Sequence, residues 1–123
     1  MGQAVPARAI LIVEDEPFVR FDLMDFFEDR GFRVFGAGDA EEAIALLEAD
    51  DTIRIVFTDI QMPGAMDGLM LAHHIRERWP PTLLIVASGR VTPRDVTLPA
   101  RAAFVGKPFD PREVLQEIER RSV

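Results

Sequence analysis

The chain has 123 residues, contains no cysteine and carries a formal net charge of −7. A single domain of this size buries enough apolar surface to fold without covalent staples, and the lack of cysteine excludes disulfide and zinc–thiolate chemistry. The acidic balance argues against nucleic acid as the main partner, because phosphate binding needs clustered Lys and Arg.

No apolar run is long enough to span a membrane, and residues 1–8 lack the basic start and apolar stretch of a signal peptide. We therefore expect a cytoplasmic protein without membrane partners. The sequence indicates a flexible N-terminus over residues 1–8 and one domain over residues 9–121. We find no internal repeat or linker.

Five short apolar segments are distributed along the chain. Several are nearly continuous in Ile, Val, Leu or Phe rather than alternating, which is typical of strands covered on both faces in a parallel sheet. The predicted strands are Ala9–Val13, Arg33–Ala37, Ile53–Thr58, Leu83–Ala87 and Ala102–Val105.

Helix signals separate most of these strands. The first helix is predicted from Pro17, a favoured residue at the N1 position, to about Arg30. A second follows the capping residue Asp39, a third spans Gly68–Trp79 before a proline pair, and a last one follows Asp110. The alternation of strands and helices predicts an α/β fold with a doubly wound parallel sheet.

The segment Ser88–Ala102 differs from the other connections because it contains Pro93 and Pro99. We expect at most one or two turns of helix there. The chain ends shortly after the last predicted helix, so we expect no further domain attached to it.

Chemically reactive side chains follow the ends of four predicted strands. In a doubly wound sheet, ligands bind beyond the carboxyl ends of the strands. The residues at these ends are Glu14, Asp15 and Glu16, then Asp59, then Ser88, and finally Lys107. Taken singly, each is better explained as a turn, cap or solvated residue; together they indicate one site.

The chemistry of this set is specific. Crowded carboxylates repel one another and favour a divalent cation. Oxygen donors without His or Cys select Mg²⁺ or Mn²⁺ over zinc. An ammonium and a hydroxyl opposite the metal can bind phosphoryl oxygens, and a carboxylate between them can act as a nucleophile that forms an aspartyl phosphate.

Several motifs in this order resemble the receiver domains of bacterial response regulators, most closely those that stand alone as single domains. The motifs are Ile12–Glu16, Thr58–Pro63, Met66–Gly68, Ala87–Gly89 and Phe104 with Lys107–Phe109. The resemblance covers Ala9 to about Arg120. It implies a five-stranded sheet of flavodoxin-like order 2-1-3-4-5, with helices on both faces and a short or irregular fourth helix.

The resemblance also implies roles for the acidic residues. Asp59 matches the phospho-acceptor, and Glu14 and Asp15 match the acidic pair that holds Mg²⁺, with Asp15 as the direct ligand. The backbone carbonyl of Gln61 matches a further metal ligand, and Asp59 itself also contacts the metal. The implied phosphoryl donor is a sensor histidine kinase or a histidine phosphotransfer protein.

Residues near the last two strands match the elements that read out phosphorylation. By resemblance, Ser88 and Lys107 contact the phosphoryl group, the Lys107–Pro108 bond is cis, and Phe104 swings inward when Ser88 moves. An ordinary core position on the fifth strand is the alternative interpretation of Phe104. The output is then a changed surface for a protein partner, and the only catalysis is the domain's own phosphorylation and dephosphorylation.

Two departures from the family pattern affect the expected surfaces. The loop Met62–Gly68 is one residue longer than in most receivers, and the segment Ser88–Phe104 is short and interrupted by prolines. Because the fourth helix forms part of the family's usual dimer face, we expect a monomer or a weak homodimer.

Three other functions fit the sequence less well. A haloacid dehalogenase needs a second Asp two residues after its nucleophile, where this chain has Gln61. The acidic residues after the first strand would repel the phosphate of a flavin, and the complete residue set argues against a degenerate receiver that is not phosphorylated. His73 and His74 suggest phosphohistidine, but their mid-helix position favours a solvated or half-buried role.

Overall fold

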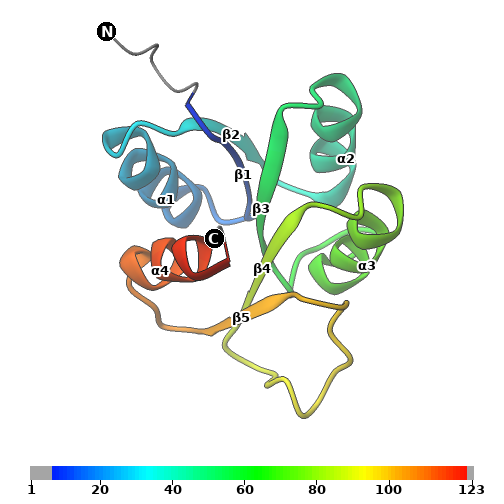
Figure 1. Ribbon diagram of the computed structural model, residues 1–123. Coiled ribbons are helices and arrows are strands. Elements are labelled where there is room, and N and C mark those ends of the chain that lie inside the picture. The colour runs from blue at the N-terminus through cyan, green and yellow to red at the C-terminus, as the bar shows by residue number, and fades with distance from the viewer. Residues whose placement is uncertain (1–6, 122–123) are drawn as a thin grey trace, which may run out of the picture.

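A five-stranded parallel sheet forms the centre of the computed structural model, which describes residues 7–121 (Figure 1). The strand order is β2-β1-β3-β4-β5, and every neighbouring pair is parallel. The strands are β1 (Ala9–Val13), β2 (Arg33–Ala37), β3 (Ile53–Asp59), β4 (Leu83–Ser88) and β5 (Ala103–Gly106). This order is the one that the family resemblance predicted.

Two layers of helices cover the two faces of the sheet. Helices α1 (Pro17–Asp29) and α4 (Pro111–Arg121) lie on one face, and α2 (Ala40–Ala49) and α3 (Gly68–Arg78) lie on the other (Figure 1). Alternate strand residues point to opposite faces, so β1 contributes Ile10 and Ile12 to one core and Leu11 and Val13 to the other. Burial on both faces explains the continuous apolar composition of β1, β3 and β4.

Side chains that accept hydrogen bonds fix where three of the helices begin. The carboxylates of Glu16, Asp39 and Asp67 accept hydrogen bonds from backbone N–H groups three residues ahead, each at 2.9 Å. Each cap satisfies a donor that the first helical turn leaves free. The starts of α1 and α3 matter for function because both lie beside the carboxyl edge of the sheet.

The connection between β4 and β5 is a loop with turns and without a helix. This agrees with the prediction of at most one or two helical turns. Two contacts hold the loop against α3: His73 Nε2 donates to the carbonyl of Thr97 at 2.7 Å, and Arg76 Nε donates to the carbonyl of Ala100 at 2.8 Å. The helix that follows β5 is accordingly the fourth in this chain.

β1 and β2 have the predicted bounds, and the other three strands differ from the predicted ones by a single residue. Asp59 and Ser88 are the last residues of β3 and β4, not the first residues beyond them, and β5 is shifted by one position. Of the predicted flexible N-terminus, residues 1–6 lie outside the described part of the chain. Within residues 7–121, no helix combines the length and the apolar character that crossing a bilayer would require.

Candidate functional site

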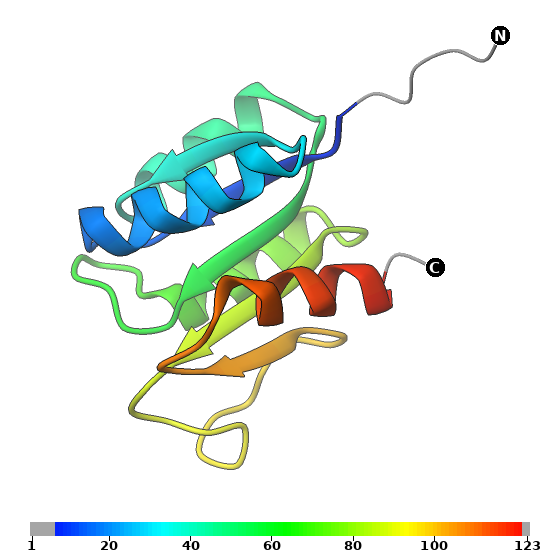
Figure 2. The same ribbon diagram turned by 90° about the vertical axis from the view of Figure 1, so that its left-hand side faces the viewer.

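The carboxyl ends of the parallel strands gather the predicted site residues at one edge of the sheet. Figure 2 shows the tips of the strands pointing to the same side. The register pairs Val13 with Thr58, which places Glu14 beside Asp59, and pairs Ser88 with Gly106, which places Lys107 next to them. Residues separated by 93 positions in the chain thereby come within contact distance.

Lys107 bridges two buried carboxylates. Its Nζ atom lies 2.8 Å from Asp59 Oδ2 and 3.4 Å from Glu14 Oε1. Glu14 is 1% exposed and Asp59 is 4% exposed. Lys107 is also the only lysine in the chain, all other basic residues being arginines or histidines. One compact ammonium therefore faces two desolvated negative charges, and the exposed Asp15 adds a third nearby.

One oxygen of Asp59 has no partner. Oδ1 is buried and makes no hydrogen bond, and no other side-chain nitrogen or oxygen of the described residues is in that position. A buried, unpaired carboxylate oxygen is costly. Glu14, Asp15 and Asp59 can each offer a carboxylate oxygen, and these atoms lie within 4.8 Å of one another. Three hard oxygen donors around an unsatisfied anion fit Mg²⁺ or Mn²⁺.

Burial and neighbouring charges shift the pKa values at this site. Burial raises the pKa of Glu14, as does the charge of Asp59, and these effects outweigh the hydrogen bond from the Glu16 N–H and the charge of Lys107. Partial burial by itself lowers the pKa of Lys107, but the hydrogen bond and charge of Asp59, together with Glu14, raise it overall. Lys107 thus stays a cation at neutral pH.

Ser88 is buried, and its hydroxyl group already has hydrogen-bond partners. Its hydroxyl donates to Gln61 Oε1 at 2.8 Å and accepts from the N–H groups of Arg90 and Val91, both at 3.1 Å. It makes no hydrogen bond to Asp59. Sequence reasoning assigned Gln61 a role through its backbone carbonyl and missed its side chain, because a contact between the ends of two strands depends on the register of β3 and β4.

Comparison with known proteins identifies the family. The response regulator receiver domain family matches residues 10–119 of this chain. The chain belongs to this family. A curated relative, the aerobic respiration control protein ArcA of Escherichia coli K12, is 39% identical over 108 residues, which are 85% of this chain and 44% of ArcA. The transcriptional regulatory protein PdtaR of Mycobacterium tuberculosis H37Rv is 34% identical, over 94% of this chain and 57% of PdtaR. The receiver chain thus spans about half the length of the curated relatives it matches.

Solved structures agree with this assignment. A response regulator receiver protein from Pseudomonas putida has a TM-score of 0.82 at 26% identity and covers 96% of this receiver and 100% of its own chain. The response regulator TrrA from Thermotoga maritima, solved in complex with Mg²⁺ and beryllium fluoride, has a TM-score of 0.81 at 27% identity, with 92% and 97% coverage.

Gly68 of the receiver packs against the backbone of Asp59. A Cβ atom at Gly68 would lie 1.6 Å from the Asp59 carbonyl oxygen, so no other residue fits without a shift. The Gly68 N–H donates to the carbonyl of Ile60 at 2.9 Å, and Thr58 Oγ1 donates to the Asp59 carbonyl at 3.0 Å. The start of α3 therefore sits directly on the end of β3. The sequence contained this glycine in a motif but did not indicate why it is needed.

The remaining predicted residues lie outside the acidic cluster. The Lys107–Pro108 bond is cis, as the resemblance implied. Phe104 is partly buried against the core under α2 and α3, which suits a core residue as well as a mobile one. His73 is exposed and bonded to the β4–β5 loop, and the half-buried His74 lies against the Trp79 ring. These positions agree with the predicted solvated or half-buried role of the two histidines.

Proposed function

We propose that this receiver domain accepts a phosphoryl group on Asp59 from a phosphohistidine of a sensor histidine kinase or a histidine phosphotransfer protein. One observation carries the proposal: Asp59 is buried, with one oxygen held by Lys107 and the other without a partner. A structural carboxylate at 4% exposure would have both oxygens paired. An acceptor needs one oxygen free to form a bond.

The transfer is a displacement at phosphorus. A carboxylate oxygen of Asp59 attacks, the P–N bond of the phosphohistidine breaks, and the electron pair returns to the imidazole ring, which then takes a proton. The product is an acyl phosphate on Asp59. Attack by water later yields inorganic phosphate and restores the carboxylate. The domain is therefore a signalling module and not an enzyme acting on other substrates.

The residues that would hold Mg²⁺, or Mn²⁺ in its place, are Asp15, Glu14, Asp59 and the backbone carbonyl of Gln61. When bound, the cation neutralises charge that develops on the phosphoryl oxygens. Lys107 supplies a second positive charge and orients Asp59 through its hydrogen bond at 2.8 Å. The complex of TrrA with Mg²⁺ and beryllium fluoride supports this choice of cation.

We infer that Ser88 reports the phosphoryl group. Its hydroxyl is held by Gln61 at 2.8 Å, so binding a phosphoryl oxygen requires it to exchange partners. A contact that exists in one state and not the other is what a switch needs. Since Ser88 also accepts from Arg90 and Val91, its movement would shift the start of the β4–β5 loop, and the partly buried Phe104 would adjust with it.

The donor's docking surface lies at the start of α1. Phe18 is 81% exposed and Phe21 is 53% exposed, and their spacing of three residues places them on one side of the helix. Large exposed aromatic side chains are typical of protein interfaces. α1 begins two residues after Asp15, so a partner bound there brings its phosphohistidine to the acidic edge. A cytoplasmic location and the absence of nucleic-acid or membrane partners complete the proposal.

Phosphorylation by acetyl phosphate tests the acceptor. Wild-type protein with Mg²⁺ should gain one phosphoryl group by intact mass, and hydroxylamine should remove it, as expected of an acyl phosphate. Asp59→Asn should not be labelled. Asp67→Asn is the matched control, because asparagine can retain the cap on α3 and labelling should persist. A hydroxylamine-stable label, or a label on Asp59→Asn, would move the chemistry to His73, His74 or Ser88.

Amide hydrogen exchange tests the readout. Beryllium fluoride with Mg²⁺ should add protection over residues 88–107 and 59–68, because the β4–β5 loop would be tightened by the new contacts of Ser88 and Lys107. Protection spread uniformly, or confined to the acidic cluster, would contradict the switch. Such a domain would store phosphate without changing a partner surface.

A further inference from the structure

The edge of the sheet opposite the acidic site carries a concentration of positive charge. A hollow of about 810 Å³ lies where the strands begin. Six of the chain's fourteen basic residues line it, and none of its twenty-one acidic residues does. The six are Arg8, Arg54, Arg76, Arg101, Arg120 and Arg121.

Parallel strand order explains how these arginines meet. Arg8 precedes β1, Arg54 is the second residue of β3, Arg101 lies just before β5, and Arg120 and Arg121 end α4. Strands that all end at one edge also all begin at the other. Arg54 and Asp59 are five residues apart on β3, or about 16 Å at the usual rise per residue. The two charged regions therefore lie on opposite edges of the sheet.

Several of the guanidinium groups are not neutralised. Arg8 and Arg54 have no ion pair or side-chain hydrogen bond within the described residues. Arg101 donates one hydrogen bond to the Pro80 carbonyl, at 3.2 Å. The guanidinium group of Arg76 is held in place by the hydrogen bonds that it donates to the carbonyls of Pro80, Thr82 and Ala100. Only Arg120 and Arg121 share a carboxylate, that of Glu117.

Electrostatics and backbone conformation both single out this hollow. Burial lowers the pKa of Arg76, and the charge of Arg101 lowers it further, so two cations stand near each other without an anion between them. Arg101 has a φ of 63°, the only positive value for a non-glycine residue in the described chain. Such a conformation is unfavourable for a residue with a side chain, and outliers of this kind concentrate at ligand sites.

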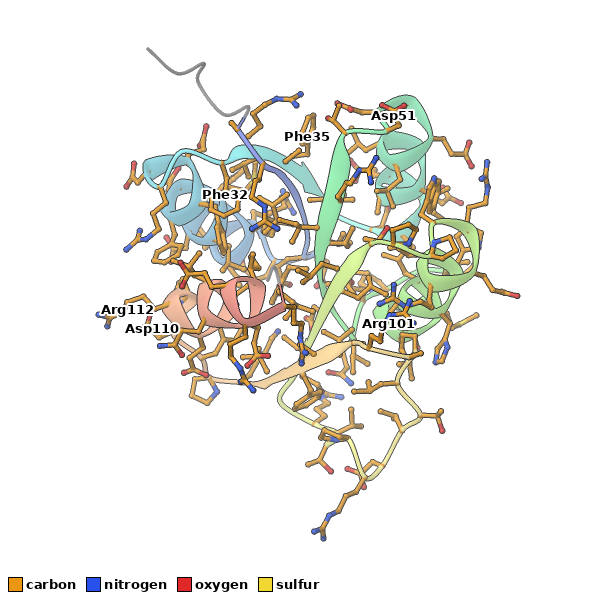
Figure 3. The ribbon with its side chains drawn as sticks, in the orientation of Figure 1. Phe32, Phe35, Asp51, Arg101, Asp110 and Arg112 are labelled. Carbon is orange, nitrogen blue, oxygen red and sulfur yellow. The ribbon has the colours of Figure 1, made fainter. Side chains whose placement is uncertain are left out.

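We propose that the hollow binds a small anion that carries several phosphate groups. Guanidinium groups donate paired hydrogen bonds to phosphate oxygens, and a chain of phosphates can reach several arginines at once. A long polyanion such as nucleic acid is disfavoured, since outside the hollow eight basic residues are outnumbered by twenty-one acidic ones. Figure 3 shows Asp51 apart from Arg101, and Asp51 lines two neighbouring hollows that share Arg54 with this one.

The phosphate chain can belong to inorganic polyphosphate or to a nucleotide. A smaller hollow of about 270 Å³ adjoins the first and shares Arg54, Pro81 and Thr82 with it. Trp79 and Leu47 give it an apolar side, and Asp51 and Arg78 are its other charged residues. A nucleotide base would have an apolar surface there, whereas inorganic polyphosphate would leave it empty. Titration of both ligands distinguishes the two sources.

Isothermal titration calorimetry of the full chain with tripolyphosphate, in buffer freed of divalent cations, tests the proposal. One molecule should bind. Arg54→Gln and Arg101→Gly should each weaken binding at least tenfold, and Arg101→Gly should fold normally because glycine accepts a φ of 63°. Arg94→Gln, which removes an exposed arginine of the β4–β5 loop outside the hollow, should bind like wild type.

The outcomes separate the possible ligands. Tighter binding of ATP than of tripolyphosphate assigns the site to nucleotides, and weaker binding assigns it to free polyphosphate. The proposal is wrong if tripolyphosphate binds no better than sulfate at equal ionic strength, or if Arg94→Gln loses as much affinity as Arg54→Gln. Tighter binding of an oligoglutamate peptide or an oligonucleotide would equally overturn it. None of these results depends on phosphorylation of Asp59.

Discussion

Removing the ammonium of Lys107 should destabilise the receiver domain in the absence of metal. Lys107→Met keeps most of the apolar stem of the side chain and leaves Glu14 and Asp59 buried without a cation. At 2.8 Å and 3.4 Å, with an effective dielectric constant of about 20, each Coulomb attraction is roughly 5–6 kcal/mol. The sum of the two attractions is an upper bound on what Lys107 contributes to stability, because desolvation of the charges opposes it.

Two features reduce the net loss. The Lys107 side chain is 31% exposed, so water partly replaces the ammonium, and Glu14 can take up a proton. Breaking a buried pair costs about 3–5 kcal/mol, and we expect the lower end, about 3 kcal/mol. Most domains have free energies of unfolding of roughly 5–15 kcal/mol. The variant should therefore remain folded with a clearly lower stability.

The pH dependence of stability should keep its sign but become stronger in the acid range. In the wild type, the raised pKa of Lys107 contributes stability that is present below 10.5 and lost as the pH rises through the higher folded value. In Lys107→Met, the pKa of Glu14, already raised by burial, rises further. The difference in proton affinity between the folded and the unfolded state therefore grows, so the variant should gain more stability than the wild type as the pH falls from neutral.

Urea unfolding followed by circular dichroism measures these effects. Mg²⁺ should raise the stability of Lys107→Met more than that of the wild type, because the cation replaces the lost charge at the unpaired carboxylates. Arg94→Met is the matched control, since it removes an exposed cation without an ion pair. The reasoning is refuted if Lys107→Met is as stable as the wild type without metal, or if Mg²⁺ stabilises both proteins equally.

Three further outcomes are expected. Asp15→Asn should abolish Mg²⁺ binding in a metal titration, and a titration curve like that of the wild type would contradict the ligand assignment. In metal-free buffer its midpoint of thermal unfolding should equal or exceed that of the wild type, because one repelling carboxylate is gone. Gly68→Ala should lower the free energy of unfolding by about 3 kcal/mol or more and slow labelling by acetyl phosphate, because its Cβ would meet the Asp59 carbonyl at 1.6 Å. An unchanged free energy of unfolding would show that α3 can move freely. The hydrogen bonds from Arg112 lower the pKa of Asp110 to about 2, so the stability that this pair contributes should be lost as the pH falls from about 4 to 2. Asp110→Asn should therefore make the stability less dependent on pH in that range. An unchanged acid unfolding curve would show that this exposed pair contributes nothing.

Much of the site could be predicted from the sequence because all strands of a parallel sheet run in the same direction. Continuous apolar runs identified strands buried on both faces, and the chemistry at four strand ends could be read directly, since parallel strands end at one edge. Glu14, Asp59, Ser88 and Lys107 were placed together by this argument, and the structure brings them together. The prolines of residues 88–102 likewise predicted the weak fourth connection, where the structure has no helix.

Contacts that depend on register and packing were decided only by the tertiary structure. The bridge from Lys107 to two carboxylates, the unpaired oxygen of Asp59 and the hydrogen bond between Ser88 and Gln61 each depend on shifts of a few ångströms between neighbouring strands. The arginine hollow depends on the same rule at the other edge, but its members are scattered from Arg8 to Arg121 and form no motif. Single arginines resemble any solvated charge until the fold brings them side by side.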